Sequence, residues 1–405
     1  LRTPMKTVWI INQFAGTPKV GANQRHFHLV KYWQSKGLNV VLISNSNNHL
    51  IAPENHSKKG FVIEDGVAFY WIKTLKHSHK SLLRFVSMIE FALRVGSLVF
   101  KRKQLGTPNI IILSCVSIFP MLQALFLKWY FRADKFIYEI RDLWPLTPIL
   151  LMGFSKWNPL IIYIAWLEKL GYRKAQEIVS LLDGSERYIN PISKDPSKYH
   201  CIPNGIPESF LDLSTVIPKK MDQIGDKKLF AYIGTFGFAN ALEPLIELLL
   251  DQKGMEEKIH FLFVGAGPLK AAMEKELAFI TNVTFVGRVP REEVRNYLSI
   301  VDIAFTARHH SPLYDFGVSA NKYYDYMASG TPILAAHHGI NDLVQINNCG
   351  LHVKNEREAI REGISEFLSL PADQYKLMGE KGRKAVEAFT YENLAQRYIE
   401  VMERT

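Results

Sequence analysis

Residues 7–44, TVWIINQFAGTPKVGANQRHFHLVKYWQSKGLNVVLIS, contain one complete β-loop-α-β pattern. The apolar run at 7–11 predicts a strand, and a loop that contains Gly21 follows it. A helix is predicted from about 23 to 35, and a second apolar run predicts a strand at 39–44. This order is typical of a Rossmann-type unit, in which ligands bind at the carboxyl ends of the strands.

The same alternation continues along the chain and then begins again. In the first half, further strands are predicted at 67–72, 110–114, 136–139 and 177–181. In the second half, strands are predicted at 229–233, 259–264, 284–286, 303–306 and 332–335. Helices are expected between them, near 243–250, 268–277, 291–299 and 321–328.

A change of composition separates the two halves. Residues 204–228 are rich in proline and glycine and lack periodicity, which predicts a linker. We therefore expect an α/β protein with two Rossmann-like domains, 5–203 and 229–385, that face each other across a cleft. The last periodic segment, within 386–405, is expected to be a helix that could pack back onto the first domain.

The composition restricts the function classes. A chain of 405 residues exceeds one ordinary core, and 47% hydrophobic with 22% charged residues is ordinary for a folded protein. The net charge of +10 favours a polyanionic partner, which could be nucleic acid, anionic lipid or a phosphorylated small molecule. Three widely spaced cysteines argue against a disulfide framework and a zinc site, and favour a reducing compartment.

Much of the positive charge lies in one segment. Residues 73–103 hold eight Lys or Arg and one acid, Glu90, so their net charge is +7. Apolar residues recur there at helical spacing, namely Leu82, Phe85, Val86, Ile89, Leu93 and Val99. Such a helix could lie on an anionic bilayer, or its apolar stripe could face the domain core.

Two neighbouring segments bear on membrane contact. Residues 143–167 carry one charge, Lys156, among three tryptophans, and their prolines disfavour a straight spanning helix. A shallow membrane contact, a groove for a lipid tail and an ordinary core segment all remain open. The uncharged run 105–127 is long enough to span a bilayer, but Pro120 divides it, which favours a strand followed by a helix.

The chemistry is concentrated in residues 317–333, GVSANKYYDYMASGTPI. A loop of small residues leads into a helix that begins near Asn321, and such a helix start is a natural anion site. Lys322 adds a cation that suits a diphosphate. Asp325 lies one turn further along, where its carboxylate could accept hydrogen bonds from two ribose hydroxyls.

This segment resembles the donor-site signature of the retaining glycosyltransferase family 4, and is most similar to the branch that builds bacterial O-antigen and capsule repeats. Four other stretches agree with that branch. YEIRDLWP (138–145) resembles its E-x-R-D-L-W-P segment, and CIPNGI (201–206) resembles the I-P-N-G-I motif before its second domain. YIGTFG (232–237) and FVGAGP (263–268) resemble its two glycine turns.

The resemblance implies a GT-B fold, an acceptor on the first domain and a sugar nucleotide mainly on the second. It implies that Asp325 holds the ribose, that the Arg288 backbone meets the base, and that Asp142 with Arg141 faces the transferred sugar. The diphosphate would be held by Ser319, Ala320, Asn321 and Lys322, facing Gly234, Thr235 and Phe236. Gly21 and Arg25 would belong to the loop on the acceptor side.

The sequence departs from the wider family in two places. Members typically carry two glutamates eight positions apart, whereas this chain has Asp325 and, eight residues earlier, Gly317. Asp315 could supply the missing carboxylate. The family's Arg and Lys after the first glycine turn are also absent, so Lys322, Arg288, Arg308 or Arg25 would have to bind phosphate.

The sequence contains no Asp-x-Asp pair and no metal-ligand spacing, so we expect a metal-independent reaction with a nucleotide sugar, UDP-linked by family resemblance. The resemblance implies transfer with retention, of a sugar expected to be N-acetylated, to a lipid-linked saccharide in bacterial surface polysaccharide synthesis. We expect a cytoplasmic protein, peripheral on the inner face of the membrane. The alternatives are a nucleotide-sugar epimerase or inverting transferase of this fold, an inactive membrane-bound scaffold, and a nucleic-acid binder.

Overall fold

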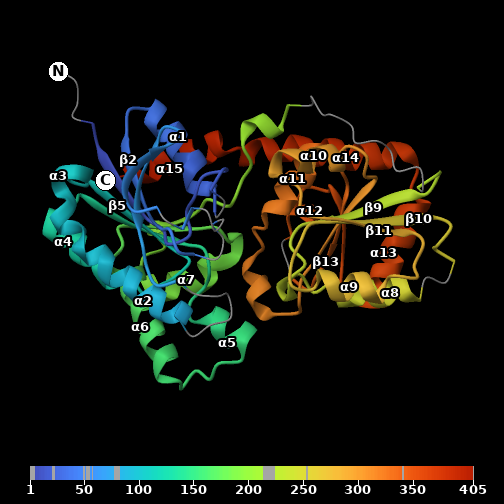
Figure 1. Ribbon diagram of the computed structural model, residues 1–405, viewed down its shortest axis with the longest axis horizontal. Helices are drawn as coiled ribbons and strands as arrows, with labels where there is room; N and C mark the ends of the chain where they lie inside the picture. Colours follow the sequence, from blue (N-terminus) through green and yellow to red (C-terminus); the bar gives the residue numbers. More distant parts are fainter. Residues whose placement is uncertain are drawn as a thin grey trace. The chain divides into compact units, whose positions relative to one another are not determined.

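The protein, in a computed structural model, is described at residues 5–20, 23–48, 51, 55–56, 58–76, 83–212, 224–251, 254–339 and 342–404. The chain divides into two compact units. The first comprises Leu1–Asn204 with Tyr391–Thr405, and the second comprises Gly205–Thr390. Each unit holds its own sheet with helices on both faces (Figure 1).

The sheet of the first unit has the order β3-β4-β2-β1-β5-β6-β7-β8. Its strands are β1 (Thr7–Ile11), β2 (Asn39–Asn45), β3 (Gly60–Glu64), β4 (Val67–Ile72), β5 (Ile110–Cys115), β6 (Lys135–Ile140), β7 (Glu177–Ser180) and β8 (Tyr199–Cys201). Neighbouring strands are parallel except at the edge, where β3 pairs antiparallel with β4.

Helices cover both faces of this sheet, which explains why its strands are apolar without alternation. Val8 and Ile10 of β1 pack into a core with α1 (Arg25–Ser35) and α15 (Tyr391–Glu403). Trp9, between them, faces the other side, where its ring lies 5.2 Å from that of Phe131. Figure 1 shows α1 and α15 on one side of the sheet.

The opposite face of the first sheet is covered by α2 (Leu83–Gly96), α4 (Met121–Phe131) and α6 (Pro159–Lys174), which contact one another in that order. Shorter elements complete the unit. They are η2 (Ser97–Lys101), α3 (Arg102–Leu105), α5 (Leu146–Met152), η3 (Asp183–Ser185), α7 (Glu186–Ser193) and η4 (Pro196–Lys198).

The second unit has a six-stranded sheet, all parallel, of order β11-β10-β9-β12-β13-β14. Its strands are β9 (Lys228–Ile233), β10 (Ile259–Val264), β11 (Val283–Val286), β12 (Ile303–Ala307), β13 (Ile333–Ala336) and β14 (Gly350–Val353).

Two cores lie on the two faces of the second sheet. One, rich in phenylalanine, packs the strands against α8 (Glu243–Leu250), α9 (Lys270–Glu276) and α13 (Arg357–Ser369). The other packs them against α10 (Arg291–Leu298), α11 (Asn321–Ser329) and α12 (Leu343–Ile346). The remaining elements are η5 (Glu208–Phe210), η6 (Phe238–Asn240), η7 (Pro312–Phe316), α14 (Ala372–Val386) and η8 (Glu387–Phe389).

The strands and helices expected from the sequence are confirmed, with ends that differ by one or two residues. The Rossmann-type pattern predicts parallel strands, and this prediction is wrong at β3, which pairs antiparallel with β4. Strands β3, β8 and β14 were not predicted. They lie at sheet edges and none of their residues is fully buried, so they lack the continuous apolar pattern of central strands.

The chain passes from the first unit to the second after Asn204 and returns to the first at Tyr391. In the region expected as a linker, residues 205–212 and 224–228 pack on the second unit: Ile206 is fully buried, and Arg295 donates to the carbonyl oxygens of Ser209 and Asp212. After α14, helix α15 packs on α1, where the indole of Trp33 donates to the carbonyl oxygen of Ala395 at 3.0 Å.

The layer formed by α2, α4, α5 and α6 leaves many apolar side chains in solvent. The apolar stripe expected on the basic segment is partly exposed: Val86, Ile89 and Leu93 are 45–65% exposed, while Met88, Phe91 and Val95 form the buried side of α2. Leu82 lies outside the described residues. No helix in the described part of the chain has the length and apolar character needed to cross a bilayer.

Candidate active site

The start of α11 combines the features expected of an anion site. Gly317 has a φ of +97°, a conformation that suits glycine, and it turns the chain toward Ala320, the residue that precedes the helix. Ala320 gives the helix no side-chain cap, and the first turn holds no acidic residue. The Tyr323 amide donates to the Ala320 carbonyl oxygen, and no side-chain cap occupies the rest of this helix start, which therefore suits an anion.

Lys322 is held over the end of β9. Its ammonium donates to the hydroxyl of Tyr232 and to Oδ1 of Asn240, each at 3.0 Å, and lies 4.2 Å from the centre of the Tyr232 ring. Tyr232 and Asn240 in turn donate to the carbonyl oxygen of Thr235. The ammonium is thus fixed beside the first glycine turn.

Burial lowers the pKa of Lys322 well below its ordinary range, and the nearby charge of Arg308 lowers it further. No acidic side chain among the described residues acts on Lys322 to offset these effects. A bound phosphate would offset both effects and favour the charged form of Lys322, so Lys322 and Arg308 together suit an anion.

Asp325 lies one turn after Asn321 and is engaged by a residue that the sequence analysis did not single out. Its Oδ1 accepts a hydrogen bond from Arg291, at the start of α10, at 3.0 Å. Burial raises the pKa of Asp325, and Arg291 opposes that rise. The arginine orients the carboxylate, so a ribose would have to share Asp325 with Arg291.

The two glycine turns pack against each other. A side chain at Gly265 would place its Cβ 1.9 Å from the carbonyl oxygen of Gly234, and one at Gly267 would meet the Phe236 carbonyl at 2.3 Å. The second turn therefore needs glycine for close backbone packing. The resemblance to a family motif finds these positions without showing their purpose.

The first glycine turn offers little free backbone. The amides of Gly234 and Phe236 donate to the carbonyl oxygens of Val264 and Ala266. The Phe236 side chain is fully buried against Phe263, so it cannot face a ligand. Thr235 is exposed between them and is the member of this turn that remains available.

The other residues expected to bind donor lie in different surroundings. Arg288 is exposed after β11, and Arg308 follows β12 with its guanidinium 5.5 Å above the Tyr314 ring. Ser319 shares a hydrogen bond with the Tyr324 hydroxyl at 3.1 Å. Asp315 lies in η7, two residues before Gly317, so the chain places a carboxylate close in sequence to the position that lacks one.

In the first unit, Arg141 and Asp142 form the turn that follows β6. Burial raises the pKa of Asp142, whereas the charges of Arg141 and of Arg84, from the start of α2, lower it. Arg84 was not anticipated as a partner. It lies 58 positions away along the chain, and only the packing of α2 beside this sheet edge brings it near.

A buried polar network lies directly beneath this turn and was also missed. Glu139 is fully buried on β6, where its Oε1 accepts a hydrogen bond from Ser114 at 2.8 Å and lies 2.8 Å from Nε2 of His26. Asn12 donates to Ser114 at 2.9 Å. His26 and Arg25 hold the pKa of Glu139 well below its usual range against the effect of burial. A glutamate inside an apolar strand was the available signal.

The two residues expected in the acceptor-side loop have different outcomes. Gly21 lies outside the described residues. Arg25 is the first residue of α1 and only 1% exposed, and it is engaged by Glu139 and by backbone carbonyl groups. A side chain committed in this way is not free to bind phosphate.

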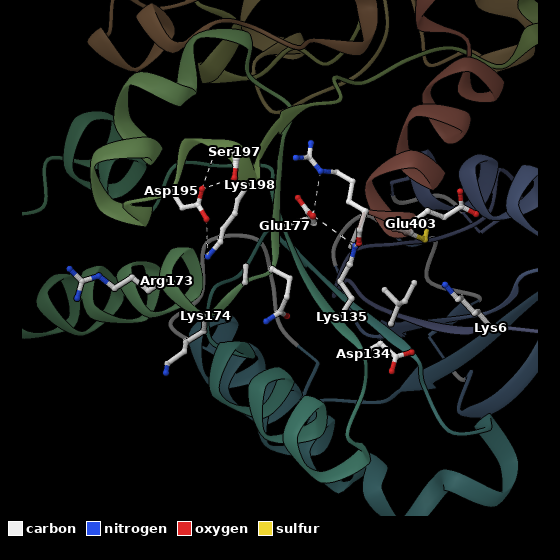
Figure 2. Close-up of a pocket in the computed structure, with 15 residues that line it drawn as sticks. Lys6, Asp134, Lys135, Arg173, Lys174, Glu177, Asp195, Ser197, Lys198 and Glu403 are labelled. Atoms are coloured by element: carbon white, nitrogen blue, oxygen red, sulfur yellow. Dashed lines mark hydrogen bonds and ion pairs between the residues drawn. The ribbon is translucent and has the colours of Figure 1, made fainter.

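A separate cavity of about 740 Å³ lies at the amino ends of β5, β6 and β7 (Figure 2). Figure 2 shows Lys135 and Glu177 directed toward each other on its wall, with 3.8 Å between Nζ and Oε1. Lys135 also donates to the carbonyl oxygen of Val401. None of the predicted site residues lines this cavity, and it opens at the sheet edge opposite to Asp142.

Among the described residues, no group of three or more His, Cys, Asp or Glu is arranged to hold a metal ion.

Residues 215–385, which include α11 and both glycine turns, match the family described as "Glycosyl transferases group 1". This family match supports the assignment of the protein as a glycosyltransferase. No curated protein sequence matches the chain.

Solved structures of glycosyltransferases share the fold over the whole chain. Sucrose-phosphate synthase from Thermosynechococcus elongatus has a TM-score of 0.73 at 17% identity, with 98% of each chain covered. HepE from Anabaena in complex with UDP has a TM-score of 0.69 at 11% identity, covering 98% of this chain and 99% of its own. WaaG, a glycosyltransferase involved in lipopolysaccharide biosynthesis, has a TM-score of 0.65 at 12% identity, covering 98% and 100%.

These likenesses establish the GT-B fold for this glycosyltransferase, with two Rossmann-like domains, as the sequence predicted. At these identities they carry no finer assignment. The placement in family 4, the O-antigen and capsule branch and the individual site residues stay predictions.

Proposed function

We propose that this protein is a retaining glycosyltransferase of family 4 that moves a sugar from a UDP-linked donor to a lipid-linked saccharide. The acceptor would lie on the first domain (5–203) and the donor mainly on the second (229–385). The sugar is expected to be N-acetylated, and the product to be part of a bacterial surface polysaccharide.

The observation that carries this proposal is the arrangement around Lys322. A half-buried ammonium is held by Tyr232 and Asn240, beside Arg308 and at an uncapped helix start. This environment suits a diphosphate leaving group, because cations and backbone amides would stabilise the negative charge that develops on it. Asp325, one helical turn further, would bind the ribose while Arg291 orients it.

Asp142 would face the transferred sugar, with Arg141 and Arg84 favouring its ionised form. In a same-face displacement, the acceptor hydroxyl could give its proton to the departing phosphate, so the mechanism would need no separate base. HepE with UDP and an Escherichia coli protein with UDP-2-fluoroglucose have this fold, which supports the choice of a UDP donor.

The exposed apolar layer of the first unit supports a peripheral position on the inner face of the membrane. Trp129, Trp157 and Trp166 are 50–75% exposed on or beside α4 and α6. Basic side chains lie on the same helix as Trp129 and on the elements that contact it: Lys128 is on α4, and Arg94 on α2 and Lys101 on η2 are exposed. Tryptophans with surrounding cations suit the headgroup region of an anionic bilayer.

The donor assignment can be tested by thermal unfolding with a panel of nucleotides. A ligand that binds only the folded state raises the Tm. UDP should raise the Tm of the native protein and of Lys270→Ala, a control on α9 of the same unit whose lysine pairs with Glu274. Lys322→Ala should keep its fold and lose most of the shift and of turnover. Full activity in Lys322→Ala would refute the phosphate role.

A further inference from the structure

Arg25 joins two segments of the first unit that lie far apart in sequence. Its Nε lies 3.5 Å from Oε2 of Glu139, at the end of β6. The other nitrogens of the same guanidinium donate to the carbonyl oxygens of Pro203 and, at 2.8 Å, of Ile202. One buried side chain therefore connects β6 to the last residues before the chain leaves this unit.

Glu139 has little freedom to move independently of Arg25. Ser114 and His26 bind one of its oxygens, and Asn12 supports both of these side chains, with Nδ2 at 2.9 Å from Ser114 Oγ and 3.3 Å from His26 Nδ1. Displacing a charge in such a buried cluster is costly, because it would separate Glu139 from its charge partners inside the core. Glu139 precedes Arg141 by two residues, so its position sets that of the turn.

The returning chain is held by the same helix. The chain leaves the first unit after Asn204 and re-enters it at Tyr391. The ring of Tyr391 stacks on His28 with 4.8 Å between centres, and His28 lies three residues after Arg25 on α1. The first turn of α1 thus contacts both points where the chain crosses between the units.

We propose that Arg25 and Glu139 are positioning residues, which hold the Arg141–Asp142 turn in register with the crossing segment at Ile202 and Pro203. This inference rests on the proposed function, in which Asp142 faces the transferred sugar.

Arg25→Lys is the informative variant. Lysine keeps the charge beside Glu139 but has no planar fork, so it cannot bind the carboxylate and both carbonyl groups together. We expect kcat to fall about 10- to 100-fold, since a small misplacement of a reacting group has an effect of that size. The KM for the donor and the affinity for UDP, measured by calorimetry, should change little because the donor site lies in the other unit.

Trp33→Phe is the matched control. It removes the buried hydrogen bond between α1 and α15, from Trp33 to Ala395, and keeps an aromatic ring beside Tyr398, the neighbour of Trp33 that interacts with Glu139. A merely structural role for Arg25 predicts that both variants lose activity in proportion to their loss of Tm. The inference is overturned if kcat of Arg25→Lys falls no further than that of Trp33→Phe at equal Tm.

A double-mutant cycle with Glu139→Gln provides a second test. If the two residues act as one unit, Arg25→Lys with Glu139→Gln should reduce kcat no more than the stronger single change does. Independent, multiplied losses would contradict the inference. Should Arg25→Lys not fold, Ser114→Ala removes one hydrogen bond from Glu139, keeps its charge pairs and should show the same selective loss of kcat. Absence of UDP binding by the native protein would instead refute the proposed function.

Discussion

At the scale of single residues, the chemistry of Lys322 depends on its neighbours more than on its own type. Tyr232 and Asn240 fix the ammonium, while burial and Arg308 disfavour its charge. The sequence alone predicted a site role for Lys322, because this residue belongs to a motif whose members are contiguous in the chain. Its partners come from 82 and 90 positions away and became visible only in the fold.

The lowered pKa of Lys322 predicts proton uptake on nucleotide binding. In the free protein, Lys322 is largely deprotonated at pH values between its lowered pKa and its ordinary value of 10.5. A bound diphosphate should restore the proton. UDP affinity should therefore fall as the pH rises through that range. Calorimetry in two buffers of different ionisation enthalpy measures the proton directly. Lys322→Met should lack this uptake, and an equal uptake in both proteins would contradict the assignment.

Gly265 predicts a packing defect. In Gly265→Ala the new Cβ would lie 1.9 Å from the Gly234 carbonyl oxygen, so the backbone would have to move, at a cost of about 1–3 kcal/mol or more. Urea unfolding should show the loss, and UDP affinity should fall with it because Gly234 lies beside Lys322. Gly287→Ala is the control, since a Cβ there meets nothing within 4 Å. Equal stability of the two variants would refute this account.

At the scale of elements, α6 illustrates how a helix seals one face of the sheet. A Cβ at Gly171 would lie 2.4 Å from Met121 and 2.9 Å from Tyr138, so the helix approaches α4 and β6 closely there. Near this contact, Glu168 is 2% exposed and accepts from Tyr172 and Tyr188 at 2.8 and 2.7 Å.

Glu168 predicts a pH-dependent stability. Burial raises its pKa from 4.5 to about 8, against the hydrogen bonds from Tyr188 and Tyr172. Its folded-state pKa exceeds the unfolded value, so the stability it contributes is present below pH 4.5 and is lost as the pH rises through about 8. Glu168→Gln cannot ionise, so its Tm should rise relative to the native protein over this interval. A constant difference in Tm across the interval would show that Glu168 does not titrate as described.

At the scale of the whole molecule, two features of the first unit act together: an exposed apolar layer and a basic segment of net charge +7 within a chain of +10. The attraction of positive charge to an anionic surface is screened by salt. The insertion of exposed apolar side chains into a bilayer is not screened in this way. The two contributions can therefore be separated by experiment.

We expect the protein to co-sediment with phosphatidylglycerol vesicles, and more weakly with phosphatidylcholine vesicles. Raising the salt from about 0.05 to about 0.5 M should weaken the binding without abolishing it. Trp129→Ser combined with Trp166→Ser should remove the salt-resistant part. Phe279→Ser, at a 92% exposed position of the second unit, should bind like the native protein. Equal binding by all three proteins would refute a membrane role for this layer.

The sequence alone determined the two α/β units, every central strand, and the segment that contains Lys322 and Asp325. These features depend on short-range patterns of apolar residues and on a contiguous motif. Only the tertiary structure decided that Arg291 binds Asp325, that Arg84 lies near Asp142, that Arg25 is buried against Glu139, and that the stripe on α2 is partly exposed. Each of these is a contact, or a missing contact, between segments distant in sequence, and it depends on how helices pack on a sheet.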